Sequence, residues 1–81
     1  MKNQILQKMQ QLLSSESQEE RVQLQIELNN LIAGYNFKDF SIELELKTKN
    51  LLIQTIVDYV DNQDELRTNN LEIQLFFFRD V

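Results

Sequence analysis

The chain contains one glycine and no proline among 81 residues, and this shortage limits what it can fold into. The tight turns that join β-strands depend heavily on these two residues. Helices, in contrast, run for many residues without either of them. The sequence therefore favours a single small all-helical domain over residues 1–81.

Apolar residues in the first half recur at helical spacing. They predict one helix over residues 5–13 and a second from about Ser17 to Gly34. Ser17 and Glu20 form a capping box, in which the serine hydroxyl and the glutamate each satisfy a free backbone N–H. Gly34 is expected to end the second helix in the left-handed conformation. The expected core-facing residues are Ile5, Leu6, Met9, Leu12, Leu13, Leu24, Leu28, Leu31, Ile32 and Tyr35.

The second half is expected to contain several shorter helices. The first would carry Phe37, Phe40 and Leu44 on one face, after a cap at Asn36 or Asp39. Polar runs at 48–50, 62–63 and 69–70 then predict breaks. Between the first two breaks lies a strong apolar stripe, made of Leu52, Ile53, Ile56, Val57 and Val60. The total is five or six short helices, packed as a compact bundle.

Three segments alternate strictly between apolar and polar residues, which is typical of half-buried strands. They are residues 22–28, 42–47 and 71–75, the last running into three phenylalanines. Their Leu, Glu, Gln and Lys residues favour helices, whereas the phenylalanines suit a strand. The alternative fold is therefore α+β, with strands at 42–47 and 71–77 around a helix from Leu51 to Asn62.

The composition argues against catalysis and against a bound metal or cofactor. Cysteine and histidine are absent, which removes a major nucleophile, the commonest general base and the best transition-metal ligands. The serines have no histidine to activate them. A calcium loop starting at Asp61 fails because Leu66 stands where glycine is needed. We expect a non-enzymatic protein with no cofactor, no metal and no small-molecule substrate.

The charge balance narrows the choice of partner. Eight basic and 13 acidic residues give a net charge of −5, which disfavours nucleic acid and anionic membranes. No apolar run reaches the length of a membrane span, and residues 1–4 do not resemble a signal peptide. We expect a cytoplasmic protein whose partner is another protein.

Six residues are candidates for that interaction. Asp58, Asp61 and Glu65 have the spacing of one acidic helix face, which is either solvated or a docking surface. Lys47 and Lys49, in a different segment, could complement it in a second copy, giving head-to-tail stacking into filaments or rings. Of the three consecutive phenylalanines, we expect two in the core. Phe76 is the candidate for an outward apolar anchor.

The later half of the chain also resembles a known family. The run LLIQTIVDYVDNQDEL, residues 51–66, is similar to the penultimate-helix region of bacterial effector-associated domains. Ile56-Val57, Tyr59 and Asp64-Glu65-Leu66 occupy the positions that carry the likeness. YNFKDFSIELEL, residues 35–46, is similar to the segment upstream, whereas the family's proline is missing from the terminal FRDV. The likeness covers residues 35–81.

That resemblance implies a six-helix, death-like fold without enzymatic activity. It also implies homotypic docking, as in adaptors of bacterial immune or conflict signalling. The alternative function is a stand-alone acidic inhibitor of the phage anti-defence, immunity or antitoxin type, which would bind and block a target protein. An adaptor domain should recur fused to other domains, whereas an inhibitor should occur alone.

Overall fold

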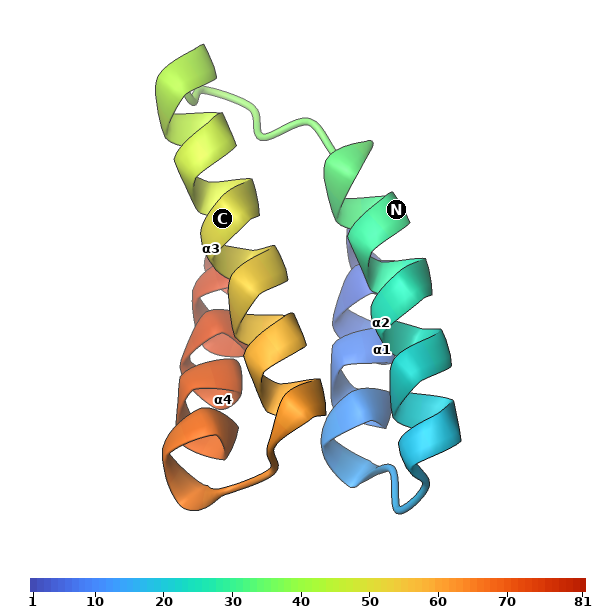
Figure 1. Cartoon of the computed structure of the whole chain (residues 1–81). Coiled ribbons are helices and arrows are strands. Elements are labelled where there is room, and N and C mark those ends of the chain that lie inside the picture. The colour runs from blue at the N-terminus through green and yellow to red at the C-terminus, as the bar shows by residue number, and fades with distance from the viewer.

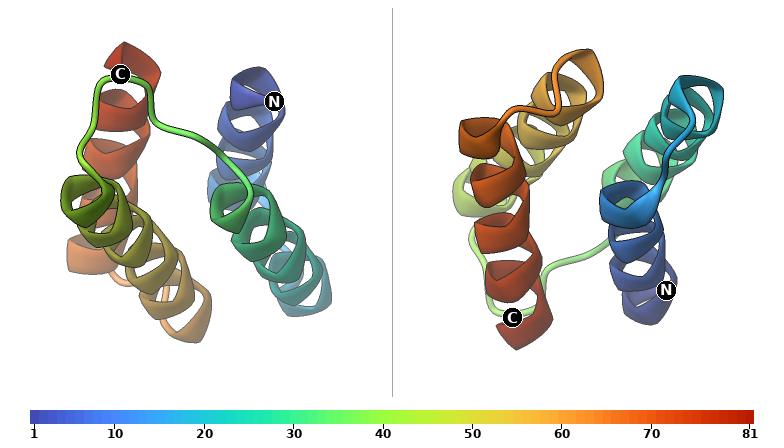
Figure 2. Two further views of the ribbon diagram at one scale, coloured as in Figure 1. Left: turned by 90° about the horizontal axis from the view of Figure 1, so that it is seen from above. Right: turned by 90° about the horizontal axis from the view of Figure 1, so that it is seen from below.

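The computed structural model describes all residues 1–81 and contains four helices and no strand (Figure 1). They are α1 (Lys2–Ser14), α2 (Gln18–Ala33), α3 (Ile42–Asp61) and α4 (Glu65–Asp80). Each helix runs antiparallel to the next. The α1–α2 and α3–α4 connections lie at one end, and both termini lie at the other (Figures 1 and 2). Around the bundle, α1 and α3 each pack against α2 and α4.

The all-helical prediction is confirmed, and the α+β alternative is wrong. Residues 22–28, 42–47 and 71–77 are all helical. The predicted count of five or six helices is also wrong, so the six-helix death-like arrangement is not formed. The second half holds two long helices in place of several short ones.

The expected break at residues 48–50 falls inside α3 because its polar residues do not interrupt the helix. The Thr48 hydroxyl donates to the Leu44 carbonyl at 2.8 Å, and the Thr55 hydroxyl donates to the Leu51 carbonyl at 2.7 Å. Such bonds satisfy a buried hydroxyl within its own helix. Asn69 and Asn70 likewise lie within α4, exposed to solvent, where their modest helix propensity costs little. The predicted break at 62–63 is confirmed.

Side-chain caps fix where three helices begin. Ser17 accepts a hydrogen bond from the Glu20 backbone N–H at 3.3 Å, as predicted, although the Ser17 N–H donates to Ser15 Oγ. The cap of α3 is Ser41, which accepts from the Leu44 N–H at 3.1 Å. Asn36 and Asp39 are not caps, and Phe37 and Phe40 lie in the α2–α3 connection. The α4 cap is Asp64, which accepts from the Arg67 N–H at 2.9 Å.

The end of α2 differs from the prediction in one detail. The helix ends at Ala33, but Gly34 has a φ of −89° and is not left-handed. The left-handed residue is Asp39, with a φ of 66°. Aspartate is among the few non-glycine residues that adopt this conformation readily. The left-handed residue of the α2–α3 connection is therefore five positions beyond Gly34.

The core contains fourteen buried apolar side chains drawn from all four helices and the α2–α3 connection. They are Ile5, Met9, Leu12, Leu24, Leu28, Ile32, Phe37, Leu52, Ile56, Tyr59, Val60, Leu71, Leu75 and Phe78.

Phe78 holds one end of this core together. Its ring makes edge contacts with Tyr35 and Phe37, at centroid distances of 5.2 and 5.7 Å. The expectation that two of the three consecutive phenylalanines would be buried is wrong. Only Phe78 is, because each residue turns a helix by about 100° and only one of three neighbours can face the core.

Candidate interaction surface

Large apolar side chains remain exposed on the outside of the second helical hairpin. Twelve such residues are exposed in the whole protein, and eight of them belong to α3 or α4. Five define what we call the α3–α4 face: Leu44, Leu51, Leu66, Ile73 and Phe77. Their exposed fractions lie between 43% and 64%.

The α3 part of this face lies on the side of the helix that borders α4. Leu44 and Leu51 are seven residues apart and therefore share one side of α3. The opposite flank faces α2. There the Lys49 ammonium donates to the Ala33 carbonyl at 2.9 Å, and the Gln18 amide donates to the Val60 carbonyl at 2.9 Å.

The α4 part points away from the core. Leu66, Ile73 and Phe77 follow the i, i+7, i+11 spacing of one helix side, whereas the buried residues Leu71, Leu75 and Phe78 occupy another. The helices α3 and α4 are antiparallel neighbours (Figure 1). From the helical positions of their exposed residues, we infer that the two stripes form one outer surface of the bundle.

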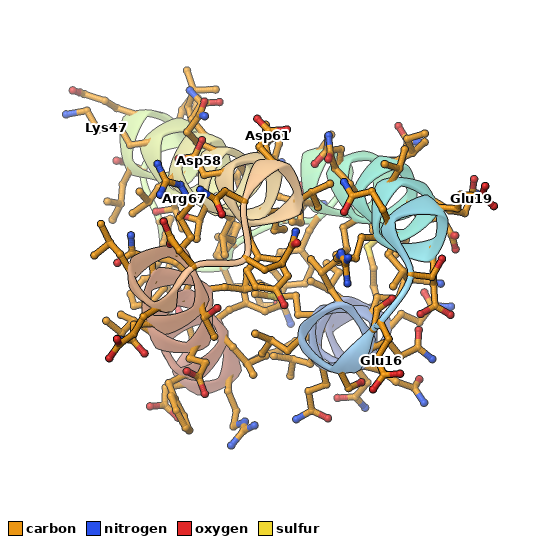
Figure 3. The ribbon with its side chains drawn as sticks, turned by 60° about the horizontal axis from the view of Figure 1, so that its bottom comes forward. Glu16, Glu19, Lys47, Asp58, Asp61 and Arg67 are labelled. Carbon is orange, nitrogen blue, oxygen red and sulfur yellow. The ribbon has the colours of Figure 1, made fainter.

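Two of the charged residues chosen from the sequence border this face. Lys47 and Asp58 are both exposed and lie toward opposite ends of α3 (Figure 3). Lys47 is three residues after Leu44, and Asp58 is seven after Leu51, which places both on the outer side of the same stripe. The structure thus brings a positive and a negative side chain onto one face, not onto separate faces.

The other four candidates occupy different positions. Asp61 is exposed at the end of α3, and Glu65 lies in the first turn of α4, so it does not continue the Asp58 face. The Lys49 side chain is only 15% exposed and joins α3 to the end of α2. Phe76 is exposed beside the α3–α4 face, and its ring lies 5.3 Å from the Arg79 guanidinium carbon.

The bundle also separates charge along its length. The end that carries the α1–α2 and α3–α4 connections holds seven of the 13 acidic residues and two of the eight basic ones. This acidic end comprises Glu16, Glu19, Glu20, Asp58, Asp61, Asp64 and Glu65, with Arg21 and Arg67. Figure 3 shows Glu16, Glu19, Asp58, Asp61 and Arg67 at this end. The acidic end therefore accounts for a charge equal to the whole net charge of −5. The opposite end is close to neutral.

One ion pair joins the first two helices outside these surfaces. The Lys8 ammonium lies 2.7 Å from the Glu27 carboxylate, linking α1 to α2. This hydrogen bond, helped by Gln23, holds the pKa of Glu27 below its ordinary value of 4.5. The pair is a packing contact of the first hairpin, and neither residue lies on α3 or α4.

The structure has no internal pocket, and no group of three or more acidic residues is placed to share a metal ion. None of the four helices combines the length and the apolar character needed to cross a bilayer.

No protein-family model, curated protein or solved structure matches this chain. The resemblance of residues 35–81 to effector-associated domains therefore gains no support from known proteins. The features that point to a function are therefore the α3–α4 face and the acidic end of the bundle.

The sequence did not predict that the residues of the α3–α4 face are exposed together; they were expected only in the core or in strands. Their shared position can be recognised only once α3 is known to be one continuous helix of 20 residues. Leu44 and Leu51 then fall beside the buried stripe, where a self-contained bundle would normally place polar residues.

Proposed function

We propose that this protein is a non-enzymatic interaction module that associates with a protein partner, principally itself, through the α3–α4 face. The observation that carries the proposal is the set of five exposed apolar side chains on two neighbouring helices. The bundle has a complete core without them. Clustered apolar side chains at a monomer surface are typical of protein interfaces.

The free energies of burial and of association suit a weak and reversible contact. Fully burying a large apolar side chain stabilises a complex by about 1.5–3 kcal/mol, so five half-exposed ones contribute roughly 4–7 kcal/mol per protomer. Association itself costs about 4–15 kcal/mol in lost freedom. Two such faces together contribute roughly 8–14 kcal/mol, which is of the same size as this cost. A near balance of this kind favours an adaptor that assembles as its concentration rises.

In this role the chain would serve as a homotypic adaptor or assembly domain. Placing that role in bacterial immune or conflict signalling rests on the resemblance of residues 35–81 to effector-associated domains alone, since the six-helix fold that the resemblance implied is not formed. The absence of cysteine and histidine supports a purely binding function.

A second candidate function rests on a different observation, the acidic end of the bundle. A charge of about −5 concentrated at one end would complement a basic groove on a target protein, as a small acidic inhibitor does. In that case a target protein, and not a second copy, would cover the acidic end. Reversing the charges of Asp61 and Glu65 would then abolish binding.

The test compares two isoleucines on different faces by light scattering over a concentration series. Ile73→Asn removes an apolar side chain from the α3–α4 face, and Ile26→Asn removes a similarly exposed one from α2. We expect the average mass of the wild type and of Ile26→Asn to rise with concentration, while Ile73→Asn stays monomeric. Equal behaviour of all three proteins would contradict the proposal.

A further inference from the structure

We infer that the partner on the α3–α4 face is a second copy of this chain, bound antiparallel about a two-fold axis, with Lys47 of each copy facing Asp58 of the other. This inference rests on the proposed function and adds the symmetry of the contact and the residues that pair across it.

The spacing of the two charged residues carries the geometry. Lys47 and Asp58 are eleven residues apart, close to three helical turns, and therefore lie on one side of α3 about 16 Å apart. In an antiparallel pair of α3 helices centred between residues 52 and 53, residue 47 of one helix faces residue 58 of the other. The surface is thus complementary to itself, as a two-fold interface requires.

The charge distribution selects the antiparallel arrangement over the parallel one. A parallel pair would place two acidic ends side by side, and like charges across an interface are unfavourable. The antiparallel pair places each acidic end beside the opposite end of its partner. That end is close to neutral, because its five basic residues are nearly balanced by the acidic residues Asp39, Glu43, Glu45 and Asp80, so the repulsion between two acidic ends is avoided.

Neither charged group has a strong partner within its own chain. Lys47 pairs with Glu43 at 3.4 Å, but the side chains are 73% and 81% exposed, and such a pair contributes little. Asp58 accepts one hydrogen bond, from the Gln54 amide at 2.9 Å. Both groups are therefore free to pair across an interface.

The arrangement also predicts a closed dimer and not a filament. Complementary charges on separate faces would let each copy bind a further copy at either face. When both charges lie on one face, a single two-fold contact pairs all of them and leaves no free site for a third copy. The face is about 24 Å long and about 20 Å wide, since helices rise 1.5 Å per residue and are about 10 Å across. That gives a projected area of roughly 480 Å² per protomer, or about 960 Å² over both protomers, which is in the range of a weak, transient dimer.

Disulfide trapping tests the geometry directly, because the chain has no cysteine of its own. We expect a mixture of Lys47→Cys and Asp58→Cys proteins to form a cross-linked heterodimer, in which one Lys47–Asp58 pair remains intact. Each variant alone should cross-link poorly, because identical positions would be offset by about 16 Å along the helix axis, beyond the reach of a disulfide.

The other outcomes separate the two proposals. Cross-linking within each variant alone, and not in the mixture, would mean a parallel pair and overturn the arrangement. A mixture that does not cross-link while the wild type dimerises would overturn it too, and leave the proposed function standing. A wild type that stays monomeric at every concentration would overturn both.

Charge reversal provides a second measurement without new covalent bonds. Lys47→Asp should weaken dimerisation about tenfold, because two attractive pairs become repulsive. The double variant Lys47→Asp, Asp58→Lys should recover most of that loss, since the swapped charges again face each other. A single variant with unchanged affinity, or a double variant no better than the single, would contradict the pairing.

Discussion

The Glu45 carboxylate accepts a hydrogen bond from the Phe37 backbone N–H at 2.7 Å. This bond ties the α2–α3 connection to the start of α3, eight residues further along the chain. It holds Phe37 where its ring contacts Phe78, the buried residue at that end of the core. A partly buried carboxylate thereby helps to close the bundle.

Removing this carboxylate should loosen the connection. We expect Glu45→Ala to lower the free energy of unfolding by about 1.5–3 kcal/mol, the range for hydrogen bonds to charged groups. Glu45→Gln should cost less, because its amide oxygen can still accept the bond. Urea denaturation measures both, with Glu43→Ala as a control on the exposed side of the same turn. Equal stability of Glu45→Ala and Glu43→Ala would show that the bond contributes nothing.

The three consecutive phenylalanines should differ sharply in their effect on stability. Phe78 is fully buried against Tyr35 and Phe37, so Phe78→Ala should cost about 3–5 kcal/mol and bring so small a protein close to unfolding. Phe76 is 58% exposed, and Phe76→Ala should cost less than about 1 kcal/mol. Thermal unfolding, monitored by circular dichroism, distinguishes the two variants. Similar melting temperatures would mean that the burial pattern is wrong.

The Lys8–Glu27 pair predicts a small pH dependence of stability. The pKa of Glu27 is lower in the folded state, so the pair stabilises the fold above about pH 4.5. That contribution is lost as the pH falls through the lowered pKa and the carboxylate becomes protonated. Lys8→Met should therefore destabilise the protein at pH 7 and have less effect at pH 3. A difference from the wild type that does not change with pH would contradict the linkage.

The sequence predicted the helical class, the first two helices and the Ser17 cap because each depends on local features. Apolar spacing over residues 5–13 and the serine–glutamate pair act within one or two turns. The extent of α3 could not be read in the same way. Thr48 and Asn50 have the appearance of a break, and only burial of Thr48 against the bundle shows that the helix continues.

Only part of the candidate surface could be predicted, because the extent of α3 could not be read from the sequence. Lys47 and Asp58 were recognised as charged candidates, but their common face follows only from a continuous α3. The five apolar residues of the α3–α4 face could not be separated from core residues by spacing alone. Which side of α3 faces α2 depends on contacts such as that of Lys49 with Ala33, between residues 16 positions apart.

Sedimentation equilibrium of the wild-type protein, from about 1 µM to about 1 mM, measures the central claim most directly, because this range brackets the affinity of a weak dimer. We predict that the average mass rises from the 9.7 kDa of one chain toward twice that value and then levels off. A mass that stays at one chain throughout the range would contradict self-association through the α3–α4 face.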